Sequence, residues 1–322
     1  MFQQTFKNFN INFDASNVRR SVSSGDLITG QISFDLTKQT KITSITLALR
    51  GRASVHWSKG GGGGGGGRRR RRRKHFSAEL DFFNFKNVIL QENRITGAAV
   101  RLSPGTHVYP FTCQLPQGDF PSTFRGVYGH ITYTLTVGMD RPWHLTKDFV
   151  TELNFVNHID TSQPEMRAPM SGSNYMTLCC LWCNSGPITM TTSIEKKAFV
   201  PGETVKVTCK FSNASSSTAT PKVKLQQKQA YYTLNKVHKC IVSKSLVSLT
   251  GQPISGNTSG VSREIELVIP PSVSCTISNC SILDIDYLLE VSLSVTASPD
   301  LTVLFPIILC DTPVNTDPPL YL

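Results

Sequence analysis

Apolar and polar residues alternate with a period of two along much of the chain. At its start, Phe9, Ile11 and Phe13 share one face, and three asparagines occupy the other. Because successive side chains of a β-strand point to opposite faces, this pattern predicts a half-buried strand. The alternation returns in the segments 131–137, 204–211, 265–269 and 289–295. No long segment of the sequence has a helical period, so we expect an all-β protein.

Turn residues separate these apolar runs, as in "SPGTH" at 103–107, "SNASSST" at 212–218 and "SPDL" at 298–301. Short strands joined by turns, without helices between them, form antiparallel sheets, because parallel strands need long crossovers. We therefore predict two tandem immunoglobulin-like antiparallel β-sandwiches.

The length of 322 residues also favours two domains. Between His158 and Gly186 the alternation is lost, and Pro, Ser, Gly and Met residues gather. We expect an N-terminal sandwich over 1–157, a hinge-like linker over 158–185, a C-terminal sandwich over 186–312 and a short tail over 313–322.

A run of eight glycines is followed by six arginines and Lys74. Apolar alternation flanks the run, so we expect a hairpin loop, disordered over 59–75 because polyglycine is flexible and adjacent arginines repel each other. Two interpretations stay open. The loop is either solvated without specific function, or it contacts lipid headgroups through Arg68, Arg69, Arg70, Arg71, Arg72, Arg73 and Lys74.

This run supplies seven of the 33 basic residues, against 22 acidic ones, and so most of the net charge of +11. Neither stacking aromatics nor a recognition helix accompanies it, so we expect no nucleic-acid partner. The N-terminus lacks a signal-peptide pattern, and no 18-residue apolar segment is present. The nine cysteines lack framework spacing, which suits reduced thiols in the cytoplasm.

The His and Cys residues lack the spacing of catalytic and metal-binding motifs. The seven histidines form neither a metalloprotease motif nor a nucleophile elbow. Cys180 and Cys183 form one C-x-x-C pair without a second pair at zinc-site distance. We therefore expect a non-enzyme with no cofactor and no metal. Palmitoylation of Cys179 or Cys180 stays an open alternative to simple packing.

The last residues contain a P-P-x-Y motif made by Pro318, Pro319 and Tyr321. Adjacent prolines favour the polyproline II conformation, which lowers the entropic cost of binding in an aromatic groove, and the tyrosine fills a second pocket. The motif therefore predicts binding to WW domains.

Three stretches together resemble the arrestin domain-containing proteins, or α-arrestins: "SSGDLITGQISFDL" at 23–36, the segment 109–143 that closes with Arg-Pro-Trp, and "KKAFVPGETVKVTCKFSNAS" at 196–215. The residues in them also have structural interpretations. Pro201 and Gly202 suit a turn, Gly25 and Gly30 suit backbone angles that a Cβ disfavours, and Trp143 is expected to be a buried packing anchor.

The resemblance implies the arrestin fold and an adaptor function. Such an adaptor binds cytoplasmic segments of membrane receptors or transporters and brings them to WW-domain HECT-type ubiquitin ligases for endocytosis and transport. It also implies a cytoplasmic protein that is recruited to the plasma membrane and endosomes. Family members usually carry a longer tail with several P-P-x-Y motifs, so a single motif predicts modest affinity.

Two alternatives share the double sandwich. A retromer-like sorting coat subunit has no use for P-P-x-Y. A receptor-desensitising arrestin needs an interior charged phosphate sensor and a longer autoinhibitory tail.

Overall fold

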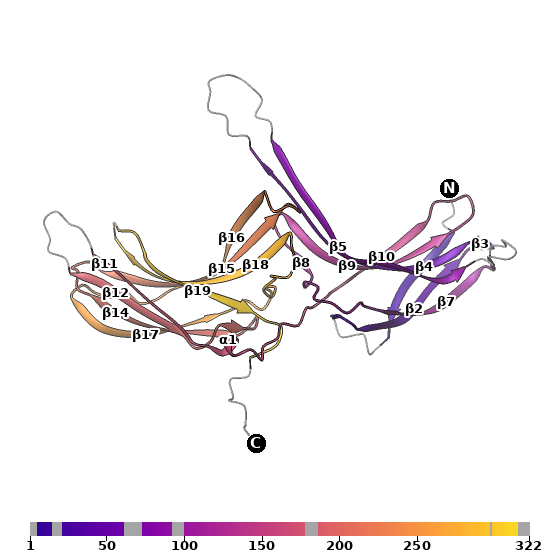
Figure 1. Cartoon of the computed structure of the whole chain (residues 1–322). Helices are drawn as coiled ribbons and strands as arrows, with labels where there is room; N and C mark the ends of the chain where they lie inside the picture. The colour runs from indigo at the N-terminus through magenta and orange to yellow at the C-terminus, as the bar shows by residue number, and fades with distance from the viewer. Residues whose placement is uncertain are drawn as a thin grey trace, which may run out of the picture. The chain divides into compact units, whose positions relative to one another are not determined.

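The computed structural model of the chain describes residues 5–14, 21–60, 73–91, 100–177, 186–296 and 298–314. Within these ranges β-strands dominate, and the single helix is the four-residue α1 (Pro164–Arg167). The chain divides into two compact units, in which unit 1 comprises Met1–Asn157, Tyr232–His238 and Asn279–Ile282, and unit 2 comprises the rest (Figure 1).

Unit 1 contains two larger antiparallel sheets and a two-stranded ribbon, counted over the described residues. The first sheet has the order β1 (Phe6–Phe13), β2 (Leu27–Leu36), β7 (Gly105–Gln114). The second has the order β10 (Lys147–Leu153), β9 (Gly129–Asp140), β4 (Ser44–Lys59), β5 (Lys74–Gln91), and β8 (Phe124–Arg125) pairs with β9. The ribbon joins β3 (Thr40–Ile42) to β6 (Val100–Leu102).

The core of unit 1 forms where the apolar faces of these strands meet. Along β9, Ile131, Tyr133, Leu135 and Val137 are all fully buried, as their alternation in the sequence predicts. The Tyr133 ring stacks on Phe155 with centroids 4.3 Å apart. Its buried hydroxyl donates a hydrogen bond of 2.6 Å to the carbonyl of Pro121, so the ring is buried without an unsatisfied polar group.

Unit 2 repeats this construction. One sheet has the order β11 (Met170–Thr177), β12 (Pro187–Ile194), β14 (Thr204–Asn213), β17 (Thr258–Val268). The other has the order β13 (Ala198–Phe199), β19 (Leu301–Leu309), β18 (Leu283–Val295), β15 (Ala219–Tyr232), β16 (Lys239–Thr250). Only β13 among the described strands of these two sheets pairs in parallel, with β19. The prediction of an all-β protein with two tandem antiparallel sandwiches is confirmed.

The two strands of unit 2 with the clearest alternation line its core. In β14 the side chains of Val205, Val207, Cys209 and Phe211 are buried, and the threonines and lysines between them face outward. In β18 the register places Leu289 between two apolar neighbours on the adjacent strands, Leu225 and Phe305. Strands β14 and β18 belong to the two different sheets of the unit. Strong alternation therefore marks a core-facing strand in each sheet.

The segment expected to be a linker contains regular structure. Residues 164–167 form α1, and β11 pairs along its full length with β12, from Met170 opposite Ile194 to Thr177 opposite Pro187. Edge strand β11 consists mainly of small and polar residues, most of them exposed, so its sequence has no apolar alternation to reveal a strand. Residues 178–185 of the expected linker, including Cys179, Cys180 and Cys183, lie outside the described residues.

The glycine- and arginine-rich run joins two paired strands, as predicted. β4 and β5 form an antiparallel hairpin whose last described pair is Lys59 opposite Lys74. Residues 61–72 lie outside the described part.

Two of the glycines in the family-like stretches have positive φ, Gly25 at +77° and Gly202 at +91°. Gly30 does not have a positive φ, so the expectation about its backbone angles is wrong. Glycine is needed there because a Cβ would lie 2.3 Å from the carbonyl oxygen of Asn12 on the neighbouring strand β1.

Candidate functional site

The P-P-x-Y residues Pro318, Pro319 and Tyr321 lie outside the described residues. The last described residue, Val314, is buried against Met166 and Cys310 in unit 2. Burial raises the pKa of the Cys310 thiol to about 12. The motif therefore begins four residues after a point that is fixed in the apolar core of unit 2.

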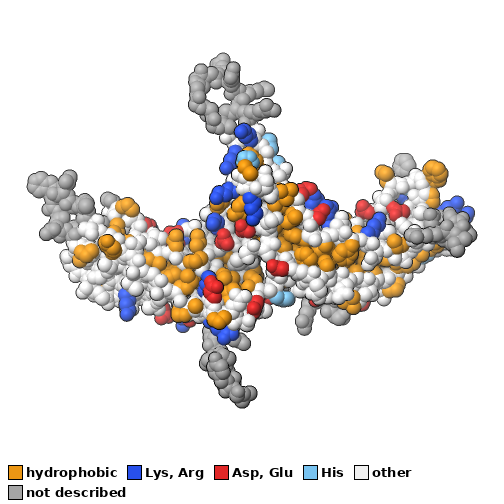
Figure 2. All heavy atoms as spheres, viewed as in Figure 1, with side chains coloured by type: hydrophobic (Ala, Val, Ile, Leu, Met, Phe, Trp, Pro, Cys, Tyr) orange, Lys and Arg blue, Asp and Glu red, His pale blue; other side chains and the backbone are white. Residues whose placement is uncertain are grey.

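The basic run is described only at its end. Arg68–Arg72 lie outside the described residues, and Arg73 and Lys74 are exposed. Lys74 lies opposite Lys59, and His56 stacks on His75 with ring centroids 5.8 Å apart. Lys, Arg and His side chains lie near the end of this hairpin (Figure 2). Most of the run lies outside the described residues, so the lipid-headgroup hypothesis for it stays a prediction.

A second basic site, not predicted from the sequence, lies beside the loop 141–146 between β9 and β10. The loop is anchored by the Asp140 carboxylate, which accepts hydrogen bonds from the hydroxyls of Ser44 (2.6 Å) and Thr146 (2.5 Å). These bonds lower the pKa of Asp140. Asp140 is therefore a charged acceptor that holds both the base of the loop and the start of β4.

Trp143, at the turn of this loop, is fully exposed, with a relative accessibility of 102%. The expectation that it is a buried packing anchor is wrong. The loop closes a hairpin through left-handed backbone at Trp143, with φ of +61°, and this turn directs the indole outward. Leu145 beside it is 92% exposed, so the loop presents two large apolar side chains to solvent.

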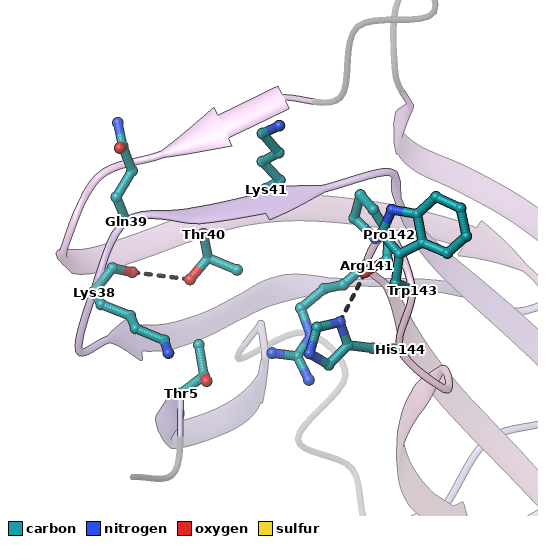
Figure 3. A pocket seen from close by; sticks show the side chains of 9 residues that line it. All are labelled: Thr5, Lys38, Gln39, Thr40, Lys41, Arg141, Pro142, Trp143 and His144. Carbon is teal, nitrogen blue, oxygen red and sulfur yellow. Dashed lines mark hydrogen bonds between the residues drawn. The ribbon is translucent and has the colours of Figure 1, made fainter.

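A pocket of about 300 Å³ lies between this loop and the turn that leads into β3. We call it the basic pocket and define it by Thr5, Lys38, Lys41, Arg141, Trp143 and His144. Lys38 and Arg141 extend toward each other from opposite sides, near Thr5 (Figure 3). Lys41 points away from Arg141, and the Trp143 indole lies at the other edge (Figure 3). None of the described residues that line the pocket is a carboxylate.

Arg141 is held in place by an aromatic ring rather than by an acid. Its guanidinium lies over the ring of Phe6, 5.1 Å from the centroid, and Phe6 is buried. The Arg141 Nε is buried and has no hydrogen-bond partner among the described residues. A buried donor without an acceptor costs free energy, about 1–3 kcal/mol for an uncharged group and more for a charged one, so the enclosed Nε is a local cost and not a contact for a ligand in the pocket.

Further cations surround the pocket. On the ribbon, Lys41 lies directly opposite Arg101. The Lys147 ammonium lies 5.6 Å from the Phe6 centroid, near Arg141, which contacts the same ring. None of these cations takes part in an ion pair formed by residues that the structure describes. Directly opposed like charges destabilise a two-stranded ribbon, and bound negative charge would offset that repulsion.

Sequence reasoning missed this pocket because its cations come from separate segments. Lys38 and Lys41 flank the start of β3, and Arg141 follows β9. The only local signal was the Arg-Pro-Trp sequence at 141–143, and there the size of Trp143 favoured a packing interpretation.

Comparison with known proteins places this fold in a family. The sequence model for "Arrestin (or S-antigen), N-terminal domain" matches residues 9–162, and the model for "Arrestin (or S-antigen), C-terminal domain" matches residues 184–314. The two matches cover most of the chain, so the protein belongs to the arrestin family. Within that family it is an α-arrestin, as the resemblance in its sequence indicates.

Individual relatives fit this placement. The chain is 27% identical over 293 residues to arrestin domain-containing protein 4 of Mus musculus. This alignment covers 91% of the chain and 69% of the relative. It is 25% identical to the Homo sapiens protein of the same name, with the same coverage. It is 23% identical over 316 residues to thioredoxin-interacting protein of Rattus norvegicus, covering 96% of this chain and 75% of the relative.

Family membership supports an arrestin-like adaptor role, since arrestin-family proteins are generally non-catalytic adaptors that bind the cytoplasmic parts of membrane proteins. Among the described residues, no cluster of His, Cys, Asp and Glu could hold a metal ion. The helix found in the described part of the chain is too short to cross a membrane.

Proposed function

We propose that the protein is a non-catalytic trafficking adaptor. It binds cytoplasmic segments of membrane receptors or transporters and recruits WW-domain HECT-type ubiquitin ligases through Pro318, Pro319 and Tyr321, and so promotes endocytosis and protein transport. It acts in the cytoplasm and is recruited to the plasma membrane and endosomes. The P-P-x-Y sequence carries this proposal, and the arrestin fold supports it by supplying a scaffold of two sandwiches without a catalytic motif.

The physical basis of recruitment is the short tail. Pro318 and Pro319 restrict their own φ angles to the polyproline II region, so little ordering entropy is lost on binding. Tyr321 supplies the aromatic side chain that fills a pocket, and such residues are typical binding hot spots. A single P-P-x-Y motif that binds a single WW domain gains no avidity, so the affinity of this motif by itself should be modest.

Capture of the full chain on isolated WW domains tests the proposal. Tyr321→Ala should weaken capture by at least about tenfold, because truncating a hot-spot aromatic typically costs 2 kcal/mol or more. Leu320→Ala is the matched control, since it changes the variable position of the motif and should retain capture. Failure of the native chain to bind any HECT-ligase WW domain would instead favour the retromer-like coat subunit.

A further inference from the structure

We propose that the basic pocket binds the phosphorylated headgroup of an anionic phospholipid, while Trp143 and Leu145 enter the interfacial layer of the bilayer. The residues that line this pocket belong neither to the P-P-x-Y motif nor to the arginine run. The proposal goes beyond the adaptor function and holds whether or not the tail binds WW domains.

The first argument is the electrostatics of the pocket. Lys38, Lys41 and Arg141 line a space of about 300 Å³, and no lining carboxylate neutralises them. The carboxylate next in sequence, Asp140, already accepts bonds from two hydroxyls that fix the loop. Concave surfaces with one sign of charge focus the field and attract counter-ions, and a pocket of this size accommodates a small polyanion.

The second argument is the preorganisation of Arg141. Stacking on the buried Phe6 ring fixes the guanidinium, so little side-chain entropy remains to be lost on binding. Phosphate oxygens are the acceptors that a guanidinium binds most effectively, in a charge-assisted and often bidentate geometry.

The third argument identifies the source of the phosphate. Trp143 and Leu145 project from the loop that lines the pocket, and both are almost fully exposed. The left-handed backbone at Trp143 is strained for a bulky residue, and such strain gathers at functional sites. A soluble phosphate or a phosphopeptide in the pocket would leave these side chains in water, whereas a bilayer interface accepts a Trp ring and a Leu side chain.

The surrounding cations fit the same partner. Positive charge around the pocket is added by Lys41, Arg101 and Lys147. An anionic leaflet extends beyond the single bound headgroup, so these cations would be attracted to the neighbouring lipids. One lipid in the pocket, two apolar side chains in the interface and a diffuse cationic rim together form a peripheral membrane contact.

Vesicle co-sedimentation of the full chain tests the proposal, using phosphatidylcholine vesicles with and without phosphatidylinositol bisphosphate. The native chain should bind the phosphoinositide vesicles. Lys38→Ala/Lys41→Ala should weaken that binding by about tenfold. The matched control Lys210→Ala/Lys244→Ala removes the same charge from exposed positions of unit 2 and should have little effect. Deletion of Gly60–Lys74 should leave the dependence on Lys38 and Lys41 intact.

Insertion has its own measurement, made with Trp182→Phe in every chain so that Trp57 and Trp143 are the two tryptophans present. Brominated acyl chains in the vesicles should quench the tryptophan fluorescence of this chain, and adding Trp143→Phe should remove most of that quenching while retaining sedimentation. Trp57 is buried and cannot contact lipid in the folded protein.

Three outcomes would overturn the proposal. In the first, Lys38→Ala/Lys41→Ala binds vesicles no worse than the Lys210/Lys244 control. In the second, bromolipid quenching persists in Trp143→Phe. In the third, a soluble phosphopeptide binds in a manner that depends on Lys38 and Lys41, but vesicles do not bind, so that the occupant is a peptide. Circular dichroism and thermal melting of each variant verify that it folds.

Discussion

Lys196 and Glu203, both in the family-like stretch 196–215, form an ion pair inside unit 2. The Lys196 side chain is only 7% exposed and that of Glu203 is 25% exposed. The Lys196 ammonium also lies 5.1 Å from the centroid of the buried Phe199 ring. Glu203→Gln keeps an acceptor for the Val200 N–H, which bonds to Glu203 at 2.9 Å, but it removes the charge that balances Lys196.

We expect this single substitution to cost about 3 kcal/mol, because it leaves an uncompensated buried ammonium. For a unit of this size the loss corresponds to a fall in melting temperature of roughly 6–12 °C. The double variant Lys196→Met/Glu203→Gln should recover most of the loss, because an uncharged thioether chain packs where the lysine stem lay and needs no counter-ion. The double variant should therefore be more stable than the single variant.

Urea unfolding followed by circular dichroism measures both changes. The control pair Lys206 and Glu266 joins neighbouring strands, with an N–O distance of 3.6 Å and both side chains more than half exposed. Glu266→Gln should change the free energy of unfolding by less than about 0.5 kcal/mol. If Glu203→Gln has an effect as small as this control, or if the double variant is the least stable of the series, the assignment of Lys196 as a buried charge that depends on Glu203 is refuted.

Two further predictions concern packing and pH. Gly30→Ala should destabilise the protein by about 1–3 kcal/mol in urea unfolding, because the new Cβ would meet the Asn12 carbonyl, and Gly60→Ala, where nothing lies within 4 Å, is the control that should be neutral. Burial raises the Cys310 pKa from 9.0 to about 12, so the unfolded chain loses this proton first and stability should fall as pH rises above about 9. The loss between about pH 8 and 10 should be about 1 kcal/mol for this thiol, so the total loss should be smaller by that amount in Cys310→Ala, measured from urea midpoints at both pH values. The remainder should persist, because burial also raises the pKa of Cys113 and Cys275.

Most of the fold was predictable from the sequence, because strands buried on one face carry the alternation that burial requires. The segment 204–211 shows this, since each apolar residue that shares its face is buried in β14. Strand β11 escaped because it lies at a sheet edge, and most of its residues remain in water. A strand that buries little apolar surface leaves little periodic signal. Edges are therefore where sequence reasoning mistakes a strand for a linker.

Trp143 was misjudged for a related reason. Size and hydrophobicity predict burial on average, but they do not encode the backbone angle at a particular turn. A φ of +61° in a hairpin loop directs the indole outward whatever its affinity for the core. The same turn places Arg141 over Phe6, so the exposure of one residue and the position of the other are two consequences of one loop conformation.

The two basic features of the chain show why charge density in a sequence is a weak guide to a binding site. Arg68–Arg73 concentrate charge along a line, and consecutive like charges repel, so the sequence alone gives no reason for them to converge on one ligand. Lys38 and Arg141 are inconspicuous in the sequence, but strand pairing fixes the elements that carry them, and their side chains converge on one pocket. Convergence on a preorganised anion site lowers the entropic cost of binding. The pocket, rather than the run, is therefore the better candidate for selective recognition of a phosphorylated headgroup.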